Sequence, residues 1–216
     1  SGNTLADGSY TFQTRVVDVA GNPGTVASQV VVVDTVIASA GSMITSISTD
    51  SGTIGDYITS DATLVINGTN SALTAGDIVQ ISLDNGATWV NTASTGATTW
   101  SYDNSANTLA DGVYTFQTRV IDLAGNPGLV TSQAVTVSTS GVTETASINA
   151  ITTDSGTSTG DYITNDNTLL ITGINSALTA GDTVQISLDN GATWVNTTPT
   201  GATTWSYDNS GNTLAD

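Results

Sequence analysis

The chain consists of near-copies of one sequence unit. Residues 1–32 and 105–136 are identical at 24 of 32 positions, and residues 61–111 and 166–216 are identical at 43 of 51. The two comparisons are offset by 104 and 105 residues, which is the size of one ordinary domain. Self-similarity at a fixed period of this length is the mark of a tandem array. The chain must therefore fold as successive copies of one domain.

The repeat boundaries do not coincide with the ends of the chain. The opening heptapeptide Ser1–Asp7 returns unchanged at Ser210–Asp216, so the sequence opens and closes inside the repeat. We expect a window from a longer array. The repeat phase predicts that 1–36 is the C-terminal part of one repeat, 43–138 is a complete repeat, 147–216 is the N-terminal part of another that lacks its last strands, and 37–42 and 139–146 are linkers.

Short strands and turns make up each repeat. Apolar and polar residues alternate with a period of two, and Gly, Asn and Asp mark turns at a spacing of about eight to twelve residues. Seven short strands in about a hundred residues are typical of an immunoglobulin-like sandwich. The predicted fold class is all-β, with tandem immunoglobulin-like β-sandwich domains stacked end to end. The predicted strands of the complete repeat are 43–48, 63–67, 78–83, 88–91, 99–102, 113–122 and 131–137.

One strand of the complete repeat carries a distinctive aromatic pattern. Residues 109–114, Leu-Ala-Asp-Gly-Val-Tyr, resemble a tyrosine corner, in which a Tyr at the start of strand F bonds back to the backbone. Phe116 stands two residues further on, where an antibody domain has its second cysteine, and we expect its ring to fill the space of that disulfide. Tyr10 and Phe12 repeat the pattern. Arg119 falls on the opposite face, where we expect it to pair with a neighbouring carboxylate.

The composition argues against several function classes. Two basic residues stand against 19 acidic ones, for a formal net charge of −17. Nucleic acid and anionic membrane both need a basic footprint, so we expect no nucleic-acid partner and no direct membrane contact. The sequence lacks Cys, His and Lys, which removes the commonest general base, the Schiff-base amine and the usual zinc ligand. We therefore expect no enzyme; a glycosidase built on paired carboxylates is the enzymatic alternative.

The loop between the first two strands is the strongest candidate metal site. Three carboxylates within twelve residues, spaced by Gly and Ser, can wrap a hard cation such as Ca²⁺, with backbone carbonyls completing the shell. The competing interpretation is that these residues only form Asx turns. The predicted ligands are Asp50, Asp56 and Asp61, with Asp111 from the neighbouring turn. Their counterparts in the next copy are Asp154, Asp161, Asp166 and Asp216.

Two further motifs have both a structural and a functional interpretation. Ser82–Trp89 and Ser187–Trp194 fit the Asp-box pattern S-x-D-x-G-x-T-W of sialidase propellers. Each occurs once within a sandwich-length repeat, so we expect a hairpin whose Asp caps the turn and whose Trp packs beneath it. Trp100 and Trp205 could stack on sugars if exposed, but the alternation of their strand favours a place in the core.

The motifs together resemble a known family. Their combination is Ile-Thr-Ser-Ile-Ser-Thr-Asp-Ser-Gly (44–52), Gly-Asp-Tyr-Ile-Thr-Ser-Asp (55–61), Gly-Asp-x-Val-Gln-Ile-Ser-Leu-Asp-Asn-Gly-Ala-Thr-Trp (76–89) and Leu-Ala-Asp-Gly-x-Tyr…Asp-x-Ala-Gly-Asn (109–126). It resembles the bacterial immunoglobulin-like repeats of giant RTX-type and biofilm-associated surface adhesins. The resemblance implies Ca²⁺-stiffened extender repeats, type I secretion, an extracellular place on the bacterial cell surface and a binding tip elsewhere.

The junctions between repeats are a second candidate Ca²⁺ location. Asp34 lies in the first linker, and Asp122, with Asp77 and Asn126, lies in loops predicted at the same pole of the sandwich. The second linker has Ser138 where the first has Asp34, so that ligand would not recur at every junction.

The sequence therefore predicts a structural spacer. Its expected partners are the neighbouring repeats of the same chain, with lateral self-association possible, and Ca²⁺ is its expected cofactor. In the alternative, the repeats themselves bind glycan or matrix through exposed Trp, or associate into extracellular filaments.

Overall fold

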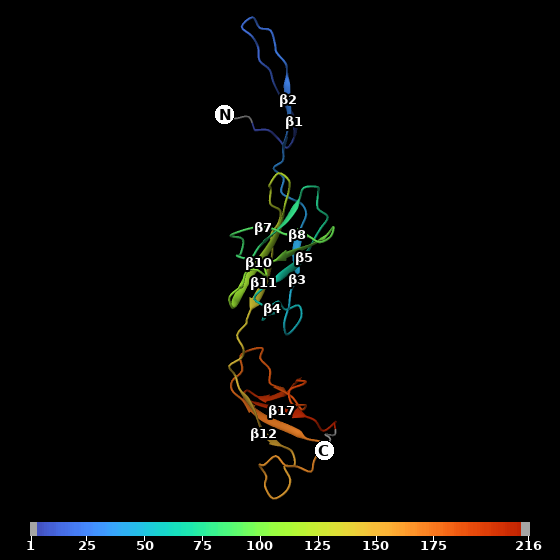
Figure 1. The fold of residues 1–216 in the computed structure, drawn as a ribbon, viewed down its shortest axis with the longest axis vertical. Helices are drawn as coiled ribbons and strands as arrows, with labels where there is room; N and C mark the ends of the chain where they lie inside the picture. Colours follow the sequence, from blue (N-terminus) through green and yellow to red (C-terminus); the bar gives the residue numbers. More distant parts are fainter. Residues whose placement is uncertain (1–3, 213–216) are drawn as a thin grey trace. The chain divides into compact units, whose positions relative to one another are not determined.

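The computed structural model describes residues 4–212 (Figure 1). The chain divides into two compact units, Ser1–Ser140 and Gly141–Asp216, and the boundary falls within the predicted linker 139–146. The regular elements of the described residues are all β-strands. No helix in this part of the chain has the length and apolarity to cross a bilayer.

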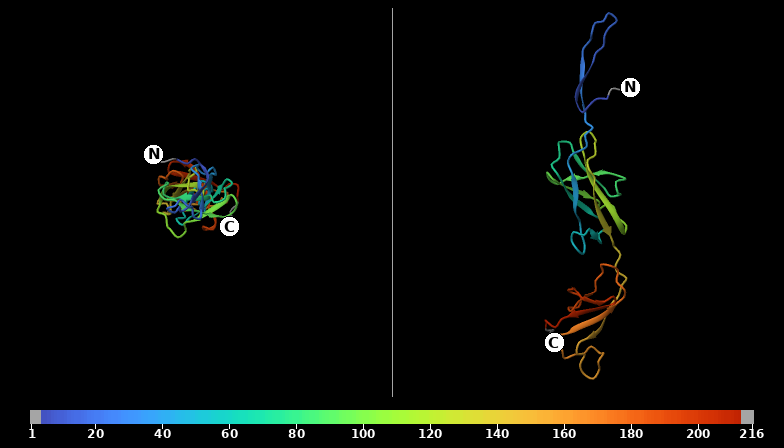
Figure 2. Two further views of the ribbon diagram at one scale, coloured as in Figure 1. Left: turned by 90° about the horizontal axis from the view of Figure 1, so that it is seen from above. Right: turned by 180° about the vertical axis from the view of Figure 1, so that it is seen from behind.

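The complete repeat is a sandwich of two sheets (Figure 2). One sheet has the order β3-β5-β9-β8 and the other has the order β4-β11-β10-β6-β7. This is the arrangement of an immunoglobulin fold, so the predicted fold class is confirmed. The strands are β3 (Ser42–Ile47), β4 (Ile58–Thr59), β5 (Val65–Asn70), β6 (Ile78–Ser82), β7 (Val90–Asn91), β8 (Ala93–Ser94), β9 (Thr99–Asp103), β10 (Gly112–Ile121) and β11 (Thr131–Val137).

The seven predicted strands correspond to β3, β5, β6, β7, β9, β10 and β11. The prediction missed β4 and β8, each of which has two residues. Such short strands carry too little alternation to detect in a sequence, because the pattern needs about four residues to be visible. β4 exists only because it pairs in parallel with the end of β11.

The core of the complete repeat lies between its two sheets. Alternate residues along β5 and β10 are buried, as the period-two pattern predicts. Burial of this apolar surface is the main driving force for the fold. The largest fully buried apolar side chains are Trp100, Phe116, Leu64, Ile66, Ile81, Val120, Val135 and Val137.

Trp100 requires a glycine opposite it. The indole packs so closely over Gly68 that a Cβ atom at that position would overlap the Trp100 ring and the carbonyl oxygen of Met43. The ring nitrogen donates to the carbonyl oxygen of Thr69, at 3.2 Å. Gly173 and Trp205 repeat the arrangement in the second unit. The sandwich therefore depends on a paired small and large residue in adjacent strands.

The tyrosine corner and the buried phenylalanine are confirmed. The hydroxyl of Tyr114 donates to the carbonyl oxygen of Ala110 at 2.8 Å, and Phe116 is fully buried.

The prediction that Arg119 pairs with a carboxylate is wrong. Its guanidinium stacks over the Trp89 ring at 4.1 Å, and its Nε donates to Gln80 rather than to a carboxylate. The half-buried face of the Trp89 indole lies next to the strand. It packs against the guanidinium of Arg119 better than a solvated Asp side chain would.

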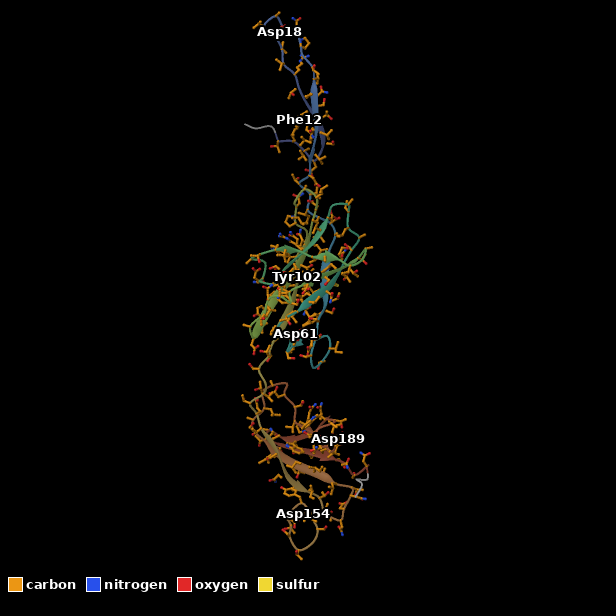
Figure 3. All side chains as sticks on the ribbon, viewed as in Figure 1. Phe12, Asp18, Asp61, Tyr102, Asp154 and Asp189 are labelled. Atoms are coloured by element: carbon orange, nitrogen blue, oxygen red, sulfur yellow. The ribbon has the colours of Figure 1, made fainter. Side chains whose placement is uncertain are left out.

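The segment before the complete repeat is a single hairpin. It consists of β1 (Gly8–Thr14) and β2 (Ala27–Val33), paired antiparallel from Gly8↔Val33 to Thr14↔Ala27. Tyr10 donates to Ala6, as Tyr114 does to Ala110. Phe12 lies on this hairpin (Figure 3).

The second unit repeats the first part of the sandwich. One sheet has the order β12-β13-β17-β16, and β14 pairs with β15. Its buried apolar cluster consists of Leu169, Ile171, Ile186 and Trp205. The strands are β12 (Ala146–Ile151), β13 (Leu170–Asn175), β14 (Gln185–Ile186), β15 (Val195–Asn196), β16 (Thr198–Gly201) and β17 (Thr204–Asp208).

Candidate metal-binding loops

The loop from β3 to β4 uses its carboxylates first to hold its own backbone. Asp50 Oδ2 accepts a hydrogen bond from the Gly55 amide at 2.7 Å. Asp56 Oδ1 accepts one from the Ile58 amide at 2.9 Å. These are the local turns that the structural interpretation of the sequence predicts.

Asp61 closes the same loop. Its Oδ1 accepts from both the amide and the hydroxyl of Thr63, each at 2.8 Å, and its Oδ2 accepts from Ser48 at 3.3 Å. The Thr63 amide is the largest of the causes that lower the pKa of Asp61 below its ordinary value. A carboxylate held in its charged form by its own loop is compatible with a nearby cation, but it is satisfied without one.

Asp111 contacts the chain that leaves the repeat. Both of its oxygens accept hydrogen bonds from the segment that follows β11: the amide and hydroxyl of Thr139, at 2.9 and 2.7 Å, and those of Ser140, at 3.3 and 2.8 Å. The Thr139 hydroxyl is the main cause that lowers the pKa of Asp111 to about 2. Asp111 therefore anchors the exit of the repeat. Asp7 does the same in the preceding copy by accepting from Thr35.

The second unit has similar turns in this loop, although Asp154 accepts from a different amide than Asp50 does. Asp154 Oδ2 accepts from the Tyr162 amide at 3.2 Å, Asp161 Oδ1 from the Ile163 amide at 3.1 Å, and Asp166 Oδ1 from the Thr168 amide at 2.9 Å. Asp154 is labelled in Figure 3, in the loop that follows β12. Asp216, the counterpart of Asp111, lies outside the described residues.

Two atoms in these loops have a feature that capping does not explain. Asp50 Oδ1 and its counterpart Asp154 Oδ1 are buried and have no hydrogen-bond partner. A buried carboxylate oxygen without a partner is costly unless something neutralises it. Both copies also place Thr and Tyr residues at positive φ around the same turn: Thr49 and Tyr57 at 51° and 61°, and Thr153 and Tyr162 at 57° and 58°.

The loop offers ligand atoms of the type that Ca²⁺ prefers, which are oxygen atoms. Asp50 Oδ1, or Asp154 Oδ1 in the second copy, supplies a hard anionic oxygen, and the loop carbonyls supply neutral ones. Among residues 4–212, however, the structure gathers no group of three or more acidic side chains that could share one metal ion. The four predicted carboxylates therefore hold separate segments of backbone, and Ca²⁺ binding by them stays a prediction.

The predicted junction residues come together more closely. Asp34, Asp77 and Asp122 all line one cavity of 300 Å³, with the linker residues that follow Asp34. Asn126 donates from its side chain to the backbone carbonyl of Asp34 at 3.1 Å and to Asp122 Oδ2 at 3.0 Å. The Asn126 side chain is the main cause that lowers the pKa of Asp122. The sequence placed Asp122 and Asn126 at the junction but did not reveal that Asn126 holds the linker backbone.

In both Asp-box motifs the Asp caps the turn of a hairpin, as predicted, whereas the predicted packing of the Trp holds for Trp89 and not for Trp194. Asp84 accepts from the hydroxyl of Thr88 at 2.6 Å and from its amide at 2.8 Å, which lowers the pKa of Asp84 to about 2. Trp89 Nε1 donates back to the carbonyl oxygen of Gly86 at 3.1 Å. Asp189, labelled in Figure 3, makes the same bonds with Thr193, and its pKa is also lowered to about 2.

Trp100 and Trp205 are not placed where they could stack on sugars. Both indoles are buried, as the alternation favoured. The sequence analysis missed the exposed indole: Trp194 is 58% accessible. Its counterpart Trp89 is covered by Arg119.

Comparison with known proteins agrees with this fold. Residues 38–139 match a family model described as bacterial Ig-like domain, and residues 3–35 match a second model of the same description. The fold and these matches show that the matched segments are similar to bacterial immunoglobulin-like domains.

A search of solved structures gave a similar one, the tetra-tandem repeat in the extending region of a large adhesion protein. It is 21% identical, with a TM-score of 0.31. The alignment covers 95% of this chain and 49% of the other, so the chain spans about half the length of that structure. The search of curated proteins gave no match.

Proposed function

We propose that this chain is part of the extender of a large bacterial surface adhesin, which sets the distance between the cell and a binding tip. The proposal rests on one observation: the features that recur between the copies are structural ones. The Asp-box turn, the Gly–Trp pair and the tyrosine corner all recur. Duplication of such features adds length without adding chemistry.

The exit of each repeat supports a spacer function. In each of these two repeats an Asp accepts a hydrogen bond from the segment that follows the last strand. Asp7 accepts from Thr35, and Asp111 accepts from Thr139. Asn126 then fixes the linker carbonyl of Asp34 to the next repeat. A linker held at both ends transmits force and limits bending better than a free one.

The proposal includes stiffening by Ca²⁺. Its support is the buried oxygen of Asp50, repeated at Asp154, that lacks a partner in both copies. A site with the ~0.1–1 mM affinity usual for extracellular modules would stabilise each copy by roughly 1.4–2.7 kcal/mol at ~10 mM Ca²⁺. That is a large part of the stability of a marginal domain.

The proposed location is extracellular, on the bacterial cell surface, after type I secretion, with a role in adhesion or biofilm formation. The support is the match of residues 38–139 to a family model of bacterial Ig-like domains. A domain without disulfides can rely on core packing and metal for rigidity outside the cell.

The test is thermal unfolding of the chain with Ca²⁺ and with EDTA, combined with small-angle scattering. We expect a higher melting temperature and a stiffer particle with Ca²⁺. The matched variants are Asp50→Asn, which removes the charge at the unpartnered oxygen, and Asp103→Asn, a carboxylate that caps Ser105 on another loop. Equal stability and dimensions with and without Ca²⁺ would reject the metal while leaving the spacer function standing.

A further inference from the structure

The complete repeat contains a second cavity, distinct from the one at the junction. It has a volume of 300 Å³ and lies beside β7 and β8, the strands at the edges of the two sheets. Its lining includes Asn70, Asp77, Val79, Asn91 and Trp100. All the residues that line it fall between positions 70 and 100, so the cavity is formed within the complete repeat alone.

The base of this cavity is buried and its rim is exposed. At the base, Val79 is 5% accessible and Trp100 is 1% accessible. Leu73, which also lines the cavity, packs against the core. At the rim, Asn91 and Ser94 are exposed. A hollow of this kind admits part of a small molecule and removes its nonpolar surface from water.

Asn70 brings an unused polar atom to the cavity. Its side chain is 8% accessible, and its Nδ2 donates to the carbonyl oxygen of Ser71 at 2.9 Å. Among residues 4–212, nothing donates to its Oδ1, yet this atom is not one of the partnerless oxygens that are sealed from solvent. The Oδ1 atom of Asn70 therefore opens onto the cavity. A nearly buried acceptor in this position favours a ligand that supplies a donor.

Two polar side chains near the rim also have unused atoms. Asp77 accepts from the Thr74 amide through Oδ2, at 2.9 Å, which leaves its Oδ1 available. Asn91 accepts from Gln80 through Oδ1, at 3.0 Å, which leaves its Nδ2 available. Together with Asn70, these residues give the cavity two hydrogen-bond acceptors and one donor around an apolar base.

This arrangement matches the chemistry of a pyranose sugar. A pyranose ring has hydroxyl groups around its edge and C–H groups on its faces, so it can donate to the two acceptors while a C–H face covers the apolar base. The described lining has one acidic residue and no basic one, in a chain with a net charge of −17. That charge disfavours acidic sugars. A single carboxylate is too few for a Ca²⁺ site, which needs six to eight oxygens.

We propose that this cavity of the complete repeat binds one neutral pyranose ring, at the end of a glycan. Asn70 Oδ1 and Asp77 Oδ1 accept from its hydroxyls, and Asn91 Nδ2 donates to one of its oxygens. The Trp100 ring lies behind the apolar base, packed over Gly68, and does not stack on the sugar. A volume of 300 Å³ is at the lower end of ligand sites, so it holds a single ring rather than a chain of sugars.

The second unit has a smaller cavity at the equivalent positions. Its volume is 130 Å³, and its lining includes Pro199 and Thr183 where the complete repeat has Ser94 and Ile78. Pro199 keeps the strand pairing that Ser94 has in the complete repeat. The chain therefore supplies two substitutions at this cavity that the same sheet accommodates.

The first test is a titration of the ¹⁵N-labelled full chain with glucose, galactose, mannose and N-acetylglucosamine, followed by NMR. We expect at least one of them to shift the side-chain amide signals of Asn70 and Asn91, with a dissociation constant of about 1–10 mM. The matching uronic acid should bind about tenfold more weakly, because its carboxylate lies near Asp77. No shift with any of the four sugars at about 100 mM, or equal binding of the acid, would overturn the proposal.

Variants taken from the second unit test the location. Ser94→Pro narrows the rim and should weaken binding about tenfold, and Ile78→Thr should weaken it about threefold by removing apolar contact. Ile54→Thr is the matched control, since Ile54 is exposed on the loop between β3 and β4, away from the cavity. It should bind like the parent. Thermal unfolding shows that each variant is folded, and unchanged affinity in folded Ser94→Pro would overturn the location.

A charge substitution tests the polar contacts. Asn91→Asp keeps an oxygen to accept from Gln80 but replaces the free donor with an acceptor. Its affinity for the neutral sugar should fall about tenfold, whereas its affinity for protonated glucosamine should rise. A folded variant that loses both sugars equally would overturn the role of Asn91. The proposal goes beyond the extender function, and its failure would leave that function untouched.

Discussion

The hairpin β1–β2 and the strand pair β10–β11 have almost the same sequence and different structures. In the complete repeat, β10 runs ten residues from Gly112 to Ile121, because its last residues pair with β6. In the hairpin, β1 stops at Thr14, and Val17 makes only an isolated bridge to Pro23. The local sequence is enough to form the hairpin and its tyrosine corner. The length of the strand and the burial of its inner face depend on the neighbouring sheet.

The sharpest way to test this contrast is to make the same substitution in both places. Phe116→Ala should destabilise the complete repeat by about 3–5 kcal/mol, because it leaves a large cavity in a fully packed core. Phe12→Ala should leave the stability of that repeat unchanged. Urea denaturation of the full chain, followed by circular dichroism, measures both. Similar losses in the two variants would mean that the exposed hairpin is buried in solution.

The Gly–Trp pairs give a smaller but similar contrast. Gly68→Ala should cost about 1–3 kcal/mol, since the added methyl overlaps the Trp100 ring. Gly173→Ala should cost less, because Trp205 borders the 430 Å³ cavity into which its ring can shift. Gly41→Ala is the control, with nothing near its Cβ position. Thermal unfolding of the three variants ranks them, and an equal cost at Gly68 and Gly41 would remove the packing argument.

The two tyrosine corners allow the hairpin and the complete repeat to be compared through a single hydrogen bond in each. Tyr114→Phe removes the 2.8 Å bond to Ala110 and should cost the complete repeat about 0.5–1.5 kcal/mol. Tyr10→Phe removes the equivalent bond of the hairpin and should leave the transition of the complete repeat in place. Denaturant titrations of both variants are the measurement. A larger effect from Tyr10 than from Tyr114 would contradict the assignment.

Acid should weaken both units through their Asp-box turns. The pKa values of Asp84 and Asp189 are lowered to about 2 from an ordinary 3.8, mainly by the hydroxyls of Thr88 and Thr193. Because the folded pKa is depressed, this stabilisation is complete above pH ~4 and is lost as pH falls towards ~2. Melting temperatures measured from pH 5 to pH 2 should fall in that window. Asp84→Asn should reduce the fall for the complete repeat, and an unchanged acid profile would show that Asp84 is not responsible.

Most of the fold could be predicted from the sequence, because its signals are local or repeated. Alternation located seven strands, and the spacing from Asp111 to Phe116 identified the tyrosine corner and the buried ring. The partner of Arg119 could not be predicted, since Trp89 lies in the turn between β6 and β7 and only the register of β10 against β6 brings them together.

The candidate metal site was harder to predict for the same reason. The spacing of Asp50, Asp56 and Asp61 says how far apart the carboxylates are along the chain, but not which way each one points. In the structure each caps its own turn. The unpartnered oxygen of Asp50 depends on how the loop packs, which no spacing rule encodes.

The Asp-box turn has a consequence for the order in which a repeat folds. Its bonds join residues no more than four apart: Ser82 to Asp84 and Gly86, Thr88 to Asp84, and Trp89 to Gly86. Closing so short a loop takes far less time than pairing β5 with β9, whose partners lie 30 to 38 residues apart. Each repeat therefore carries its own early-forming nucleus. Adding repeats should lengthen such a chain without slowing the folding of any one of them.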